Sequence, residues 1–282
     1  MTHRGFKDTI NRLEALAASR ESACRAALAA WWQKSADTFD GLADGRTMAG
    51  HVGVVREETR ASLLERLVPV GPLDHDAVAG AFAAWWDASR PDISALAHHG
   101  YAEVVDGWLQ DVRSRLEPVL DPRTSASRRP SAAERRAVYE HPLVRHLLPG
   151  FAAELRAADD AVAAVSGRKA GKTELRAARL RVEQMEALVC PSADALPGGT
   201  RLDRERSALG ARHGEGHLVR EILYDRLQAE VEQRLRTRRE QLHDRYRTWE
   251  EKYAESLADL RAASDTAGAT LWKHLREMGY AN

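Results

Sequence analysis

Residues 217–267 read HLVREILYDRLQAEVEQRLRTRREQLHDRYRTWEEKYAESLADLRAASDTA, a run with neither glycine nor proline. Because these two residues most disfavour a helix interior, the run predicts one uninterrupted helix of roughly 50 residues, about 75 Å long at 1.5 Å per residue. A helix of this length is longer than the diameter of a small domain. We therefore expect a helical body followed by a long antiparallel helical hairpin or coiled-coil arm.

An apolar stripe runs along this predicted helix at near-heptad spacing. Its members are Leu235, Leu242, Tyr246, Trp249, Tyr253, Leu257 and Leu260. Arg239 stands where an apolar residue is due, and Ser256 lies one place before Leu257. Apolar stripes of this kind bury their side chains against a facing helix, so the stripe is predicted to be a partner-docking seam.

The same helix carries a cluster of arginines, namely Arg234, Arg236, Arg238, Arg239, Arg245 and Arg247. Interleaved acidic residues, among them Glu232, Glu240 and Asp244, reduce the positive field. Two interpretations stay open. In the first, the arginines form a solvent-exposed face and make ion pairs with acidic residues four positions away. In the second, they contact phosphate or an acidic partner.

The whole composition predicts an all-α fold. Isoleucine occurs only three times, while alanine, leucine, arginine and glutamate, all good helix formers, dominate. Further helices are predicted over Glu21–Asp40, Gly50–Leu67, His75–Ser89, Tyr101–Leu116, 151–165 and 175–189. Prolines 69 and 72 separate two of them, Asp74 is an N-cap, Pro91 and Asp92 start a short helix, and Gly100 ends it.

The clearest linker is the proline- and serine-rich stretch 117–131, which predicts a body over residues 1–122 and an elongated interaction arm over 123–282. Ser131 and Glu134 form a capping-box pattern just after it. Lysines plus arginines number 42, and so do aspartates plus glutamates. The resulting zero net charge argues against a uniformly basic surface that binds nucleic acid nonspecifically. The zero net charge divides into −5 before Arg123 and +5 from there on.

Two tryptophan pairs are embedded in similar segments. Ala29-Ala30-Trp31-Trp32 recurs 54 residues later as Ala83-Ala84-Trp85-Trp86. We expect the four indoles to anchor two similar helices in one core; the alternative is a base-stacking or ligand-binding role.

Templates for catalysis, nucleotide binding and metal binding do not fit. The segment 166–173 resembles a P-loop but has Ser166 where the first glycine belongs. The stretch 213–217 has two histidines around two glycines and lacks a third ligand, and Cys24 and Cys190 form no CxxC pair. No catalytic, cofactor or metal residue is predicted, and no membrane span or signal peptide. We expect a reduced, cytoplasmic setting.

A family resemblance rests on two runs. Residues 73–87, LDHDAVAGAFAAWWD, continue to Asp92-Ile93 and Gly100-Tyr101; the second run is Trp249-Glu250-Glu251-Lys252-Tyr253 with Ser256, Leu257 and Leu260, closing on 275–280, LREMGY. Both, in this order, resemble the C-terminal region of modification subunits of type I restriction-modification systems, which are N6-adenine DNA methyltransferases. The resemblance implies docking on a specificity subunit, with DNA held in the complex.

The chain departs from that family in lacking its enzyme. The family's Asp/Asn-Pro-Pro-Tyr/Phe motif is missing, because no Pro-Pro pair occurs anywhere. No series of predicted strands could form the sheet that carries the family's S-adenosylmethionine-binding turn. The leading hypothesis is a noncatalytic C-terminal module that works with a specificity subunit and a separate catalytic methyltransferase part. The alternative is a freestanding helical scaffold or coiled-coil adaptor unrelated to DNA.

Overall fold

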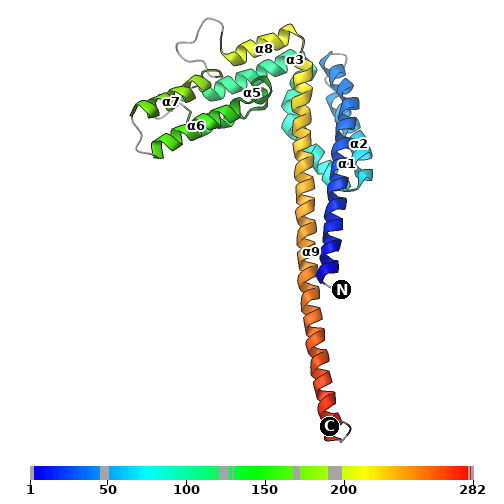
Figure 1. Ribbon diagram of the computed structural model, residues 1–282. Helices are drawn as coiled ribbons and strands as arrows, with labels where there is room; N and C mark the ends of the chain where they lie inside the picture. Colours follow the sequence, from blue (N-terminus) through cyan, green and yellow to red (C-terminus); the bar gives the residue numbers. More distant parts are fainter. Residues whose placement is uncertain are drawn as a thin grey trace.

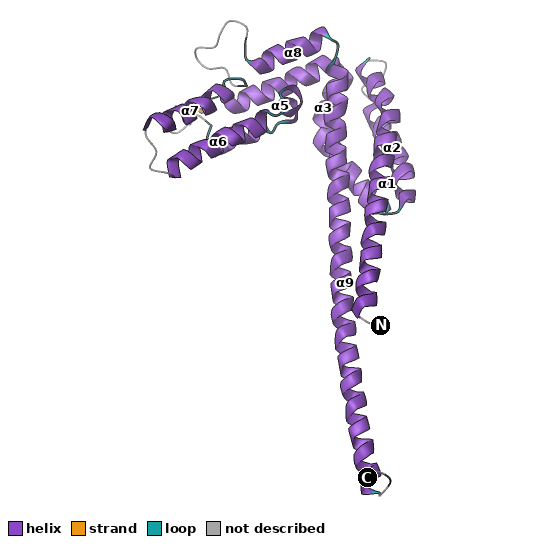
Figure 2. Ribbon diagram, in the orientation of Figure 1, coloured by secondary structure: helices purple, strands orange, loops and turns teal. Residues whose placement is uncertain are grey.

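The computed structural model describes residues 3–44, 51–117, 119–120, 127–128, 130–167, 172–189, 199–278 and 280. The all-α prediction is confirmed: helices make up almost all of the described chain (Figure 2). The described strands, β1 (Val119–Leu120) and β2 (Ser127–Arg128), are two residues each and pair antiparallel across the predicted linker.

Three helices of the front half pack against one another. They are α1 (His3–Ala43), α2 (His51–Leu67) and α3 (His75–Leu116), with a short 3-10 turn, η1 (Val68–Val70), between the last two. Asp74 caps α3 as predicted, its carboxylate accepting a hydrogen bond from the backbone N–H of Ala77 at 2.9 Å. The long helix is α9 (Glu215–Glu277), which extends the predicted run at both ends.

The prediction that Pro91 starts a new helix is wrong, because α3 continues straight through it. Pro91 and Asp87, whose carbonyl loses its helical donor there, are both exposed, so water can satisfy that group. The break comes at Gly100, as predicted, where φ is +81° and ψ is −177°. An L side chain rarely adopts that φ, so glycine turns the chain there.

Beyond Gly100 the chain builds a lobe that projects sideways from the long helix (Figure 1). In this lobe the second segment of α3 lies with the helices that follow it in the chain. These are α4 (Ala132–Tyr139), α5 (Pro142–Leu147), α6 (Phe151–Gly167), α7 (Lys172–Glu186) and α8 (Arg201–Ala211). The predicted capping box of Ser131 and Glu134 is present at the start of α4.

The helix α9 runs antiparallel to α1, and ion pairs fix their register. Arg220 of α9 pairs with Asp40 of α1, and lower down Glu232 accepts from Arg25 at 2.5 and 2.9 Å. The predicted antiparallel hairpin in the arm is not confirmed: in the described part of the chain α9 packs mainly against α3 and α1 from the front half, and Figure 1 shows the lower arm as a single helix.

The tryptophan pairs lie in the core, as expected. Trp31, Trp32, Trp85 and Trp86 are all at most 5% exposed, and Trp85 makes edge-on contacts with Trp32 and Phe39. The indole N–H of Trp85 donates to the backbone carbonyl of Leu223 in α9 at 2.9 Å. Rings this deeply buried have no free face for a base or ligand, so their role is structural.

Part of the charge division between the two halves of the chain is used in ion pairs inside the fold. Among the described residues, four ion pairs join an acid of the front half to an arginine of the back half: Glu21–Arg239, Asp40–Arg220, Asp92–Arg226 and Asp106–Arg206. In Arg25–Glu232 and Arg113–Asp203 the arginine belongs to the front half and the acid to the back half. One hydrophobic core likewise contains residues from both sides of the boundary predicted at residue 122, and that domain division stays a prediction.

Cys24 faces this core and provides a probe of it. The side chain is buried, and burial raises the pKa of its thiol to about 11. Since the thiolate is the reactive form, we expect Cys24 to resist alkylation at pH 8 in a Cys190→Ser variant and to react only after unfolding. Rapid labelling of the native variant, followed by mass spectrometry, would show that α1 detaches readily from the core.

Candidate functional site

The structure divides the predicted docking seam into three parts. Leu235 is 2% exposed and packs in the core, so this part of the seam is used within the chain. Leu242 and Tyr246 line a groove beside α1. Trp249 and Leu260, at 56% and 67% exposed, lie on the projecting arm, and the side chains of Tyr253 and Leu257 are outside the described residues.

Arg239 interrupts the seam because it has a charged counterpart on α1. Glu21 follows Leu13 and Ala17 in the α1 stripe and is only 5% exposed. The guanidinium of Arg239 donates both from Nε, at 3.0 Å, and from Nη2 to the Glu21 carboxylate, and Arg25 lies 3.5 Å from the same group. A matched pair at two facing seam positions fixes the register of the helices, since a shift of one helix along the other would leave a buried charge without its partner.

We expect Arg239→Leu to lower the free energy of unfolding by about 1 to 2 kcal/mol, because Glu21 loses one partner but keeps Arg25. The Glu21→Leu, Arg239→Leu double variant is expected to regain most of that loss, since two apolar side chains can pack at these positions. Urea denaturation of both single variants and the double variant measures the coupling. Additive effects would show that the two side chains act independently.

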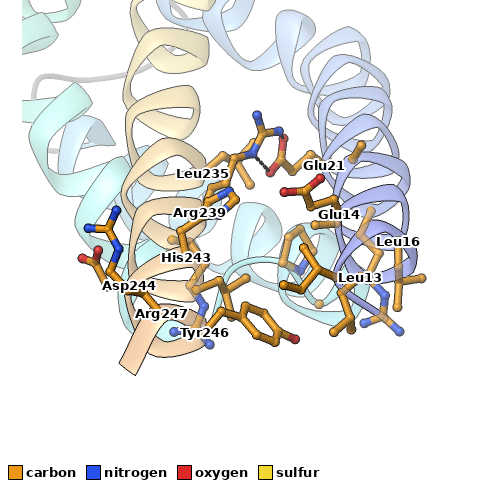
Figure 3. Close-up of a pocket in the computed structure, with 18 of the residues that line it drawn as sticks. Leu13, Glu14, Leu16, Glu21, Leu235, Arg239, His243, Asp244, Tyr246 and Arg247 are labelled. Atoms are coloured by element: carbon orange, nitrogen blue, oxygen red, sulfur yellow. Dashed lines mark hydrogen bonds and ion pairs between the residues drawn. The ribbon is translucent and has the colours of Figure 1, made fainter. Parts of the chain in front are cut away.

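The groove lies where α1 and α9 draw apart below this ion pair (Figure 3). Its volume is about 980 Å³. Apolar side chains come from both helices, namely Ile10, Leu13 and Ala17 from α1 and Leu242 and Tyr246 from α9. Charged residues of both signs surround them: Glu14, Arg20, Arg238, Asp244, Arg247 and Glu250.

The turn at Gly71 and Pro72, which joins η1 to α3, also lines the groove. Gly71 has φ of +94°, and a Cβ there would lie 2.9 Å from the guanidinium of Arg20. Both the backbone conformation and this close approach require glycine.

The α1 side of the groove was not identified from the sequence. Ile10, Leu13 and Ala17, followed by Cys24 and Leu28, form an apolar stripe with helical spacing, interrupted by Glu21. That stripe was the available signal, because a single charge within it marks a position that must face a charge. Which helix faces α1 could not be read from it, since the contact joins residues more than 200 positions apart.

The six arginines predicted as possible phosphate contacts do not share one face. At 100° per residue they are distributed around most of the helix circumference. Arg239 is paired with Glu21, Arg238 and Arg247 line the groove, and Arg236 and Arg245 are exposed. Arg234 lies against Gly80 of α3, and its Nε is buried without a hydrogen-bond partner. Phosphate contact by the remaining arginines stays a prediction.

The other sequence segments considered for chemistry stand apart from the groove. Ser166 and Gly167 end helix α6, so the element before the P-loop-like segment is a helix; residues 168–171 and Cys190 are outside the described part. His217 pairs with Glu221 at 3.1 Å. Among the described residues no three histidine, cysteine or acidic side chains gather as metal ligands. No described helix combines the length and apolarity that a membrane crossing needs.

The arrangement is suited to binding a helix. Two helices diverge around an apolar floor, and a third amphipathic helix fits such a groove with charged residues at its edges. Comparison of the chain with protein-family models, with curated proteins and with solved structures finds no match.

Proposed function

We propose that the protein is a noncatalytic helical docking module, which binds an amphipathic helix of a partner subunit in the groove between α1 and α9. The observation that carries the proposal is the apolar floor from Ile10 and Leu13 on one side to Leu242 and Tyr246 on the other, left open by the fold. Leu242 is 36% exposed there, and a partner helix would remove this apolar surface from water.

The family resemblance supplies the partner to test first. It implies the specificity subunit of a type I restriction-modification system, acting with a catalytic methyltransferase part that binds S-adenosylmethionine, and DNA within that complex. The first of its two runs, residues 73–101, lies largely in the core, where Phe82, Trp85 and Trp86 are buried. The second, from residue 249 onward, lies on the exposed arm, the part of the chain free to meet another subunit.

The test is co-expression of this chain with the specificity-like and modification-like products of neighbouring genes, followed by affinity purification. We expect the specificity-like subunit to be retained in stoichiometric amount. If neither product is retained when each is soluble by itself, the assignment to such a complex is lost.

A second candidate is a helical adaptor unrelated to DNA. The distribution of the arginines around α9, with Arg239 already paired, favours it because the six arginines do not share one face. Electrophoretic mobility shift with duplex DNA separates the two candidates. Binding by the co-purified complex whose affinity falls steeply with salt supports the DNA-linked role, and a complex that binds no DNA at low salt supports the adaptor.

A further inference from the structure

The positions of residues along the groove follow from the ion pairs that join its two helices, which are Asp40–Arg220, Arg25–Glu232 and Glu21–Arg239. About two helical turns beyond the last of these pairs, Glu14 of α1 lies level with Tyr246 of α9. One turn further, Ile10 lies level with Glu250. The groove thus extends over about three turns of helix, roughly 16 Å, from an inner half beside the Glu21–Arg239 pair to an outer half that ends at Ile10.

The unpaired charges of the inner half are positive. Arg20 and Arg238 each precede a member of the Glu21–Arg239 pair in the sequence, and both are exposed and line the groove. Neither makes an ion pair with another described residue. Arg234, one turn along α9 from Arg238, likewise has no ion pair within the described chain, and its Nε is buried without a hydrogen-bond partner.

The outer half has the opposite charge. Glu14 from α1 and Asp244 and Glu250 from α9 line it together with Arg247, so its formal charge is negative, with His243 counted as neutral (Figure 3). These four side chains are exposed, and none is ion-paired with another residue that the structure describes. The groove as a whole is nearly neutral, but its unpaired charge is segregated along its length.

This segregation limits the kind of helix that fits. When a partner covers the groove, like charges brought together oppose binding and opposite charges favour it. A uniformly basic helix would meet Arg20 and Arg238, and a uniformly acidic helix would meet Glu14 and Glu250. Only a helix that is acidic at one end and basic at the other is matched along the whole groove.

We propose that the groove binds an amphipathic helix of segregated charge, with acidic side chains beside Arg20 and Arg238 and basic side chains beside Glu14 and Glu250. The apolar face of that helix lies on Leu242 and the other floor residues. The proposal rests on the proposed function and adds the charge pattern of the partner and its placement in the groove. A partner helix is then recognisable in a sequence by acids and bases two to three turns apart around one apolar stripe.

Three synthetic helical peptides with the same leucine stripe test the pattern against the full chain. One has glutamates at one end and lysines at the other, the second has the same residues mixed along its length, and the third has lysines alone. In fluorescence anisotropy at low salt, we expect the segregated peptide to bind about tenfold tighter than the mixed one. The difference should fall to about twofold at high salt, because exposed charges are screened.

Charge reversal of the inner half provides the second arm of the test. Arg20→Glu combined with Arg238→Glu makes both halves acidic, so the segregated peptide should bind at least about tenfold more weakly and the lysine peptide should become the tightest ligand. Arg176→Glu combined with Arg179→Glu is the matched control, because both arginines are exposed on α7, away from the groove. The control should keep the preference of the wild-type chain.

Disulfide trapping tests the placement of the helix. In a Cys190→Ser background, Ala18→Cys, which lines the groove two residues from Arg20, should bond to a cysteine at the acidic end of the segregated peptide and not to one at its basic end, because bonding needs Cα atoms within about 7 Å. Trapping of the basic end, or equal affinity of the three peptides, would overturn the charge pattern and leave the docking function standing. If no peptide binds at about 1 mM, the charge pattern and the proposed function both fail.

Discussion

Replacing Trp85 by alanine is expected to lower the free energy of unfolding by about 4 kcal/mol, the largest effect of any single substitution considered. The indole is fully buried, contacts Trp32, Phe39, Phe82 and Trp86, and is hydrogen-bonded to the carbonyl of Leu223. The substitution would therefore leave a cavity at the contact between α3 and α9 and remove the additional hydrogen bond to the Leu223 carbonyl, which keeps its bond within the helix.

Urea denaturation followed by circular dichroism measures this loss. Trp85→Phe keeps an aromatic ring at this position but removes the N–H donor and part of the ring volume, and is expected to cost about 1 to 2 kcal/mol. Trp249→Ala is the control, since that ring is 56% exposed and should change stability by less than about 0.5 kcal/mol. Equal effects at Trp85 and Trp249 would refute the assignment of the core.

Leu242→Asp is expected to weaken capture of the partner helix at least about 100-fold while the chain stays folded. Leu242 lies in the floor of the groove and is 36% exposed, so a carboxylate is tolerated in the free protein but is desolvated once a partner helix covers it. Leu13→Asp, on the opposite wall, should act the same way.

Titration of each variant against the co-purifying subunit, by calorimetry or surface plasmon resonance, gives the affinities. Leu180→Asp serves as the control, because it adds the same charge at an exposed leucine of α7, far from the groove. Binding that survives both Leu242→Asp and Leu13→Asp would move the partner site elsewhere on the molecule.

Local signals in the sequence predict much of the fold. The glycine- and proline-free run predicts α9, and Asp74, Gly100 and the Ser131–Glu134 pair mark helix ends correctly. Pro91 misleads, because a proline at an exposed position costs a helix one hydrogen bond that water can replace. Such a cost is small beside the burial of Trp85, Trp86, Ile93 and Leu96 on the same helix.

Only the α9 side of the candidate site could be predicted from the sequence. The seam on α9 follows from spacing alone, but its upper part at Leu235 is covered by the chain itself, and its facing stripe on α1 lies in the front half. Arg239 looks like a defect in the seam until Glu21 is placed opposite. Pairings between distant segments depend on which apolar stripes meet, and a single sequence does not specify that.

Hydrogen–deuterium exchange on the complex with the co-purifying subunit tests whether the groove is the docking site. We expect binding to slow exchange in two separate segments, residues 10–21 of α1 and 235–250 of α9, and to leave α6 and α7 unchanged. Protection confined to the lobe of α4–α8, with both groove segments unaffected, would contradict it.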